Sequence, residues 1–211
     1  MNRTAVKRVL DVAVALGALV VSLPAGLVAA MLIKATSRGP VLFRQERVGL
    51  HEARFQMLKF RSMTTSGVGD DRAQREAIRL EIEGRRAADE HGSYKVADTR
   101  CISRVGRWLR STSIDELPQL WNVLRGEMSI VGPRPALPWE VELFPVEYRR
   151  RAEVPPGITG LWQVSGRSRL DTLDMLRLDV EYVDRWSPGL DLRIMLRTLR
   201  TLCTFWRGEA A

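Results

Sequence analysis

The sequence predicts a mainly helical α+β fold with a membrane segment at its N-terminus. Three observations support this prediction: residues 12–33 carry no charge, two short runs of strand-like composition flank Gly49, and much of the remaining chain shows helical spacing of apolar residues. The 211 residues suffice for one compact domain and a membrane element. We therefore expect an anchor at residues 1–38 and one domain at residues 39–211, on a single face of the membrane.

The uncharged stretch is long enough to cross a bilayer, because its 22 residues span roughly 33 Å as a straight helix. Pro24 closely follows Ser22 near the middle of the stretch, where a proline interrupts the hydrogen-bond ladder and allows a kink. Basic residues flank both ends of the stretch, namely Arg3, Lys7, Arg8, Lys34 and Arg38. The positive-inside rule therefore gives a crossing helix no clear direction, whereas a re-entrant helix-break-helix returns both flanks to the same face. A single span is the alternative, and the sequence favours the re-entrant form.

Residues 41–45 and 54–60 have strand-like composition on either side of Gly49, which predicts a small β-hairpin. Lys59 and Arg61 alternate with apolar residues at the end of the second run, so both cations belong to one face. Such cations either discourage edge-to-edge aggregation or bind an anion. The pattern alone gives these two interpretations equal weight.

Two segments follow that are rich in charge. Residues 72–89 fit an exposed helix of mixed charge, to which we assign no chemistry. Arg104, Arg107 and Arg110 recur at helical spacing and could face either phosphates or lipid headgroups.

Residues 113–135 contain the candidate active centre. Pro118 is tolerated in a first helical turn and not in a helix interior, so we expect a helix to begin near Ile114, with Asp115 and Glu116 at its positive end. The alternative is a capping box, in which Ser113 caps the helix and Glu116 reaches back to it.

The end of the same segment favours a functional role. Gly126 is expected to end the helix. Arg134 then lies between Pro133 and Pro135, whose fixed φ angles restrict where its guanidinium can point. Because arginine forks suit phosphate oxygens, we interpret this segment as an anion-binding active site.

The last third of the chain predicts further helices and one restrained loop. Residues 136–151 resemble a short surface helix, residues 155–167 form a glycine- and proline-rich loop, and residues 170–186 fit a core helix. Residues 190–207 place arginines on one face and apolar residues on the other. This helix either packs on the protein's own core or lies at a membrane interface, and the nearby apolar segment favours the interface.

Composition indicates an anionic partner in a reducing compartment. The net charge is +8 and the isoelectric point is about 10.3, but the cations are scattered and no nucleic-acid-binding motif accompanies them. A membrane-tethered nucleic-acid binder is therefore the weaker interpretation. Two cysteines are too few for a disulfide framework, which favours the cytoplasmic side.

The run D-E-L-P-Q-L-W-N-V-L-R-G-E-M-S-I-V-G-P-R-P at 115–135 resembles the core signature of the bacterial sugar transferases, which are monotopic phosphoglycosyl transferases. The resemblance extends to residues 39–63, including K-F-R-S-M at 59–63, and to residues 106–110 and 156–167. It implies the transfer of a sugar 1-phosphate from a UDP-sugar to polyprenol (undecaprenyl) phosphate, with release of UMP, on the cytoplasmic face of the bacterial inner membrane. A catalytically inactive, membrane-anchored binding protein of the same fold is the alternative.

The resemblance also implies a role for each matching residue. Asp115 would be the nucleophile that carries a phospho-sugar, and Asp115 or Glu116 would bind Mg²⁺. Cations at Lys59, Arg61 and Arg134 would neutralise substrate phosphates, Gln163 and Arg167 would contact the sugar, and Ser22 and Pro24 would form the membrane break. Membrane lipid is the third expected partner beside the two substrates, no nucleic acid is expected, and a homodimer is left open.

Overall fold

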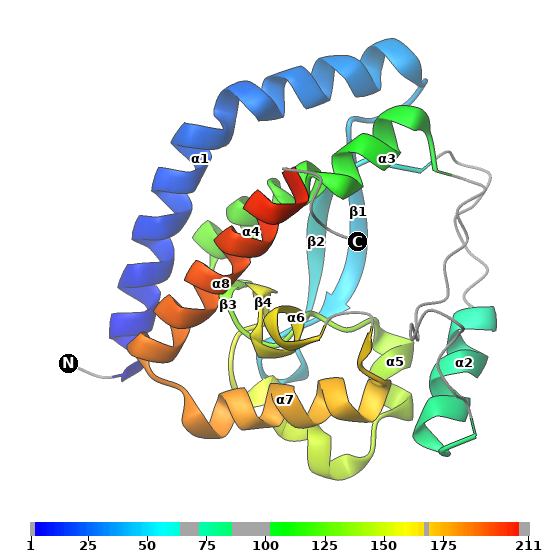
Figure 1. Ribbon diagram of the computed structural model, residues 1–211, viewed down its shortest axis with the longest axis vertical. Helices are drawn as coiled ribbons and strands as arrows, with labels where there is room; N and C mark the ends of the chain where they lie inside the picture. Colours follow the sequence, from blue (N-terminus) through cyan, green and yellow to red (C-terminus); the bar gives the residue numbers. More distant parts are fainter. Residues whose placement is uncertain (1–2, 64–71, 86–101, 167–168, 207–211) are drawn as a thin grey trace.

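The computed structural model describes residues 3–63, 72–85, 102–166 and 169–206, with the backbone alone at residues 3, 4 and 203–206. The predicted mainly helical α+β class is confirmed (Figure 1). The elements, with η for 3-10 helices, are α1 Arg3–Thr36, β1 Leu42–Val48, η1 Leu50–Glu52, β2 Arg54–Phe60, α2 Arg72–Ile82, α3 Arg104–Ser111, η3 Ile114–Glu116, α4 Gln119–Arg125, β3 Ser129–Val131, α5 Pro138–Leu143, η4 Val146–Glu153, β4 Gly157–Thr159, α6 Leu161–Ser165, α7 Thr172–Arg185 and α8 Pro188–Trp206.

The N-terminal helix α1 is continuous and bent, and it runs along one edge of the molecule (Figure 1). Helical residues continue through Pro24, so the expected break at Ser22 and Pro24 is a bend and not an interruption of the helix. Ser22 Oγ donates a long hydrogen bond of 3.5 Å to the carbonyl of Leu19, within the preceding turn. A proline that removes one N–H from the ladder accounts for such a bend.

Helix α1 exposes a large apolar surface. It is long and apolar enough to cross a membrane by length and composition, and only 11% of its most apolar window is buried. The exposed side chains on α1 are Val9, Leu10, Val14, Leu16, Val20, Val21, Leu23, Leu27, Val28, Met31 and Leu32. A soluble protein rarely leaves so many neighbouring apolar side chains in water, so α1 indicates membrane association.

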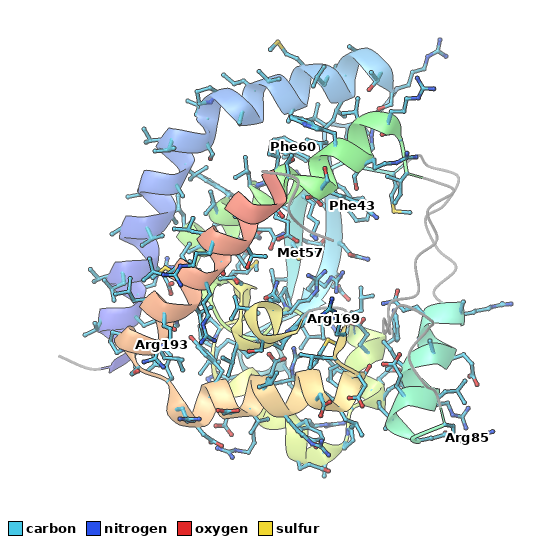
Figure 2. The ribbon with its side chains drawn as sticks, viewed as in Figure 1. Phe43, Met57, Phe60, Arg85, Arg169 and Arg193 are labelled. Atoms are coloured by element: carbon cyan, nitrogen blue, oxygen red, sulfur yellow. The ribbon has the colours of Figure 1, made fainter. Side chains whose placement is uncertain are left out.

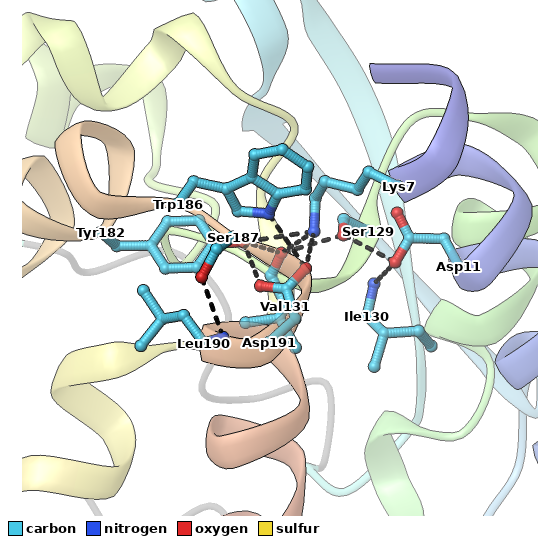
Figure 3. A network of polar contacts seen from close by, with 10 residues as sticks. All are labelled: Lys7, Asp11, Ser129, Ile130, Val131, Tyr182, Trp186, Ser187, Leu190 and Asp191. Carbon is cyan, nitrogen blue, oxygen red and sulfur yellow. Dashed lines mark hydrogen bonds and ion pairs between the residues drawn. The ribbon is translucent and has the colours of Figure 1, made fainter. Parts of the chain in front are cut away.

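The beginning of α1 is held inside the protein by charged residues (Figure 3). Lys7 is only 8% exposed and donates to Asp191 of α8 at 2.8 Å and to the carbonyl of Val131 in β3 at 3.0 Å. Asp11 accepts hydrogen bonds from the hydroxyl of Ser129 and the amide of Ile130 at 2.8 and 2.9 Å. Lys7 therefore does not flank the membrane as a free charge, because it forms a buried ion pair with Asp191.

The far end of α1 is fastened to the same domain. Ala29 and Ile33 pack with Leu109 of α3 and Ile114 of η3 in one buried cluster. Arg61 donates to both the carbonyl and the hydroxyl of Ser37, at 3.1 and 2.7 Å, just beyond the last turn of α1. Both ends of the apolar helix are thus bound to one globular domain.

The predicted hairpin is confirmed as the antiparallel pair β1 and β2. Side chains from both faces of β2 contact hydrophobic clusters that include α1: Met57 lies in a cluster with Ala15, and Phe60 packs on the cluster that contains Ala29. Figure 2 labels these two hairpin side chains. The short turn between the strands places His51 and Glu52 in the left-handed region. The hairpin is therefore part of the core that carries α1.

The second sheet was not predicted. Strands β3 and β4 pair in parallel, with Ser129 opposite Gly157 and Val131 opposite Thr159. A side chain at Gly132 would meet the carbonyl oxygen of Pro155 at 2.4 Å, so glycine is required for the two loops to approach this closely. The pair fixes the start of the Gly-Pro-Arg-Pro segment.

Helices α7 and α8 confirm the predicted helices and shift their buried faces. In α7 the buried positions are Thr172, Leu176, Asp179 and Tyr182, so only one of them carries an aliphatic side chain. In α8, Asp191 and Ile194 are buried while leucines and arginines share the exposed side. The apolar period was therefore misleading, because polar side chains fill part of this core.

Helix α2 is shorter than the predicted 72–89 and is not fully solvated. It ends at Ile82 and buries Ala77 and Glu81. The carboxylate of Glu81 accepts hydrogen bonds from the amide and hydroxyl of Thr172, which docks α2 on the start of α7. The segment at residues 136–151 forms α5 and most of η4 in place of one surface helix.

Candidate active site

The two adjacent acids lie on the short 3-10 helix η3. Ser113 adopts a left-handed conformation and makes no side-chain capping bond, so neither the capping box nor an α-helix starting at Ile114 is formed. The α-helix begins only at Gln119, after Pro118 as its N-cap residue, and Gly126 ends it as predicted. The acids are therefore presented by a tight turn, which leaves Glu116 free to point away from Ser113.

Glu116 forms an ion pair with Lys59 of β2. The Nζ atom of Lys59 lies 3.1 Å from Oε1 of Glu116, and both side chains are largely buried. Asn122 holds the strand in place for this contact, because its amide group donates to the carbonyl of Gln56 at 2.8 Å and accepts from the amide of Leu58 at 3.0 Å. The fully buried Asn122 thus fixes the part of β2 that carries Lys59.

Arg134 lines the same small pocket but belongs to a different segment from Lys59 and Glu116. The segment that carries it leaves β3, and Gly132 and Pro133 hydrogen-bond to Thr159 and Gly157 around β4. The residues that line the pocket are Met57, Lys59, Glu116, Gln119, Arg134, Pro135, Gly157 and Ile158. The structure therefore brings together three of the predicted site residues, Lys59, Glu116 and Arg134, with Asp115 next to them in the chain.

The two carboxylates differ in their electrostatic environment. Burial raises the pKa of Asp115 to about 6, and the neighbouring Glu116 adds to this rise while Lys59 opposes it. Burial also acts on Glu116, but the charges of Lys59 and Arg134 outweigh it and lower the pKa of that carboxyl. Glu116 is thus held as an anion, whereas Asp115 titrates close to neutral pH.

Lys59 is affected by the same burial. Its pKa is lowered by burial in the first place and by Arg134, while Glu116 and Asp115 oppose the change. The pocket thus holds two cations and the carboxylate of Glu116 in a poorly solvated space, with the buried Asp115 adjacent in the chain, as expected of a functional site.

Gln119 is a site residue that the sequence analysis did not single out. It is 3% exposed, it lines the pocket, and its side-chain amide interacts with the carboxylate of Glu116, whose pKa it helps to lower. A hydrogen-bond donor beside a carboxylate favours the anionic form of that group. Its position one turn after the acids, at the start of α4, is the sequence signal that could have identified it.

Other predicted site residues lie elsewhere. Arg61 points to Ser37 at the end of α1 and does not line the pocket. Gln163 of α6 donates to the carbonyl of the pocket residue Ile158 at 3.3 Å, so it supports the pocket wall. Arg167 lies outside the described residues. On α3, Arg110 donates to the hydroxyl of Ser62 at 2.9 Å.

A divalent cation fits the donor set only together with a substrate. Within residues 3–63, 72–85, 102–166 and 169–206, no group of three or more acids, histidines or cysteines gathers that could hold a metal alone. Magnesium is commonly bound by one or two carboxylates with phosphate oxygens and water completing its shell. Asp115 and Glu116 are the two adjacent carboxylates that would hold such an ion.

Comparison with known proteins agrees with this picture. The sequence pattern of the family described as bacterial sugar transferase matches residues 2–205. The UDP-glucose:undecaprenyl-phosphate glucose-1-phosphate transferase of Caulobacter vibrioides is 43% identical, with 94% of this chain and 70% of that protein covered. The galactosyl transferase CpsE of Streptococcus agalactiae is 39% identical (93% and 42%), and the exopolysaccharide production protein ExoY of Sinorhizobium fredii is 38% identical (93% and 85%). The chain thus spans about two fifths of CpsE and most of the other two.

Proposed function

Because this chain belongs to the bacterial sugar transferase family, we propose that it moves a sugar 1-phosphate from a UDP-sugar to undecaprenyl phosphate, giving polyprenyl-diphosphate-sugar and UMP. The observation that carries the proposal is the pocket in which Lys59, Glu116 and Arg134 meet beside the buried Asp115. The cations of the pocket suit a diphosphate, while Asp115 and Glu116 suit a nucleophile and a metal ligand.

The names of the relatives suggest the donor and the pathway. One relative is named for glucose 1-phosphate transfer, another for galactosyl transfer and a third for exopolysaccharide production. We assign to this chain a hexose donor, glucose or galactose, and the first membrane step in assembling an exopolysaccharide, O-antigen or similar glycan.

In the proposed mechanism Asp115 is the nucleophile. A carboxylate oxygen of Asp115 attacks the β-phosphorus of the UDP-sugar, and the bond from that phosphorus to the bridging oxygen breaks, so that UMP leaves. An oxygen of the lipid phosphate then attacks the same phosphorus and releases the carboxylate of Asp115. Each step exchanges one phosphorus–oxygen bond for another, and the sugar phosphate ends on the lipid.

The pocket residues would neutralise and position the substrate phosphates. Phosphoryl transfer depends mainly on in-line positioning and on neutralising the phosphate oxygens, which Lys59 and Arg134 are placed to do. Mg²⁺ bound to Asp115 or Glu116 and to substrate phosphates would supply further positive charge. Glu116 keeps Lys59 in position through their ion pair. We further propose Arg61, which lies outside this pocket, as a phosphate ligand, and Gln163 and Arg167 as sugar contacts.

The arrangement of α1 supports a re-entrant anchor on the cytoplasmic face of the inner membrane. The helix is attached near its start by Lys7 to Asp191 and near its end by Ser37 to Arg61. A helix whose two ends are fastened to one globular domain can reach opposite sides of a bilayer only if that domain crosses too. The pocket residues then meet soluble UDP-sugar while the lipid phosphate lies at the adjacent membrane surface.

The reaction is tested by measuring UMP release from a panel of UDP-sugars with Mg²⁺, with and without undecaprenyl phosphate. Lipid-dependent turnover with one donor, abolished by Asp115→Asn, is the expected result, and a stoichiometric burst of UMP without lipid supports the covalent step. No UMP from any donor, in folded and membrane-bound protein, would contradict the proposal in favour of an inactive binding protein.

The anchor is tested separately by cysteine labelling in sealed vesicles. Single cysteines are introduced at Asn2 and Pro40 in a variant whose Cys101 and Cys203 are replaced by serine. A membrane-impermeant maleimide should label both positions from the same side. Labelling from opposite sides would establish a crossing helix instead.

A further inference from the structure

Each backbone carbonyl of the segment around Arg134 accepts a hydrogen bond from a different part of the chain. Pro133 accepts from the amide of Gly157 at 2.8 Å, Arg134 from Nη2 of Arg151 at 2.6 Å, and Pro135 from Nη1 of Arg47 at 3.0 Å. The two prolines have no N–H, so this segment depends on its carbonyls for backbone hydrogen bonds. Two of the three donors are guanidinium groups.

The guanidinium of Arg151 is itself held in a fixed orientation. Its Nε and Nη2 atoms donate to Oδ2 of Asp179 at 2.9 and 2.6 Å, and its centre lies 5.4 Å from the ring of Phe144. The side chains of Arg151 and Asp179 are 11% and 3% exposed. Nη2 therefore contacts a buried carboxylate and the Arg134 carbonyl at the same time.

Arg47 provides the second support from the hairpin. It is 9% exposed, and its Nη2 donates to Gln45 at 2.7 Å while Nη1 reaches the carbonyl of Pro135. The neighbouring Val48 amide donates to the carbonyl of Ala136 at 2.9 Å. Arg47 of the hairpin and Arg151 of η4 thus hydrogen-bond to the same short segment from two directions.

We infer that Arg151, oriented by Asp179, is a positioning residue that holds the Arg134 guanidinium on the substrate pocket through the Arg134 carbonyl. This inference rests on the proposed function in so far as Arg134 is taken to bind substrate phosphate. A buried ion pair is by itself weak support for stability. Its geometry here matters because a planar guanidinium directs several donors at fixed angles, whereas a lysine ammonium is a single point.

A double-mutant cycle separates positioning from a merely structural role. Arg151→Lys should lower kcat/KM for the UDP-sugar about 10- to 100-fold, since a displacement of roughly 1 Å has effects of this size. In the Arg134→Ala background the same substitution should cause less than about a twofold further loss, because its target is gone. Equal losses in both backgrounds would overturn the inference.

Three further measurements make the test decisive. The control Arg150→Lys changes an exposed neighbour paired with Asp184, and it should leave kcat/KM unchanged. If Arg151→Lys does not fold, Asp179→Asn takes its place in the cycle with the same expectation. The cycle is also run on the affinity for UDP with Mg²⁺: weakening by Arg151→Lys only when Arg134 is present supports positioning, and equal weakening in both backgrounds overturns it. If the wild type shows no turnover, the proposed reaction is wrong, and the cycle on UDP affinity still tests the positioning role.

Discussion

Lys59 donates a 3.1 Å hydrogen bond to Glu116, while the adjacent Asp115 is buried and makes no ion pair within 4.0 Å among the described residues. Burial raises the pKa of Asp115 to about 6, whereas the charges of Lys59 and Arg134 outweigh burial at Glu116 and lower its pKa. Two neighbouring carboxylates thus acquire different properties, because Lys59 pairs with only one of them. Glu116 suits a permanent anion, and Asp115 suits a group that reacts.

The raised pKa of Asp115 predicts that activity declines in mild acid. Only the ionised carboxylate can attack phosphorus, and the proton returns as the pH falls through about 6. We expect kcat/KM to fall about tenfold for each pH unit below this value. Initial rates of UMP release between pH 5 and 8 measure the effect, with samples returned to neutral pH as the control for unfolding. A flat profile down to pH 5 would contradict the prediction.

Asp115→Asn should stabilise the protein while abolishing turnover. Because the folded-state pKa of about 6 lies above the ordinary pKa of 3.8 for an aspartate, ionised Asp115 destabilises the fold by no more than about 3 kcal/mol. This cost is absent below pH 3.8, grows as the pH rises and is complete above about 6. Denaturant unfolding at pH 7.5 and at pH 5 should show a larger advantage of the asparagine variant at the higher pH. An equal or reversed difference would be inconsistent with the burial of a charged Asp115.

Glu116→Gln should have the opposite effect on stability. The lowered pKa of Glu116 means that its anion stabilises the fold above the ordinary pKa of 4.5, and that this contribution is lost as the pH falls. The substitution leaves Lys59 buried without its anion and should cost about 1–3 kcal/mol. Glu46→Gln, in an exposed pair with Arg54, is the matched control and should cost less than about 1 kcal/mol. Recovery of stability in the Lys59→Met, Glu116→Gln double variant would identify the unpaired charge as the cause.

Gln119→Leu should impair catalysis in a protein that still folds. The side-chain amide of Gln119 is buried beside the carboxylate of Glu116 and helps to lower its pKa, so an apolar side chain of similar volume should cost about 1–3 kcal/mol of stability. Loss of the donor should lower kcat/KM for the UDP-sugar by about tenfold or more. Melting temperature and kinetics are measured on the same preparation. Unchanged kinetics would remove Gln119 from the site.

Substitutions on α8 test its membrane contact. Leu192, Leu196 and Leu199 are 54%, 51% and 58% exposed and lie among arginines, a combination that suits the membrane interface. Replacing all three by serine should weaken binding to anionic liposomes several-fold in a flotation assay. Val146→Ser, at a position on η4 that is 75% exposed, is the control and should bind normally. Normal binding by the triple variant would leave membrane attachment to α1 alone.

The sequence predicted those elements whose pattern of apolar and polar residues repeats within one continuous segment. The hairpin, α7 and α8 repeat their patterns over several residues, and Gly126 ends α4 because glycine readily adopts its φ of 83°. The parallel pair of β3 and β4 has only three residues in each strand, too few to show alternation. Its existence depends on the contact between Gly132 and Gly157, which are distant in sequence.

The sequence predicted which residues belong to the site better than it predicted what each residue contacts. Lys59, Glu116 and Arg134 do line one pocket, whereas Arg61, two residues after Lys59, is directed to Ser37. Gln119 and Asn122 were missed because their contribution depends on where α4 packs against β2. Similarly, Asp179 and Tyr182 occupy core positions that an apolar pattern cannot indicate, since each is buried together with a specific polar partner.

The ion pair between Lys7 and Asp191 also has a consequence for the order of assembly. Its two residues are 184 positions apart, so the ribosome completes the lysine long before its partner exists. Until α8 exists, the ammonium group of Lys7 lacks this partner and would have to remain hydrated, since burying an unpaired charge is costly. The start of α1 can therefore take its buried position only after α8 has been synthesised, which makes this contact a late step in folding.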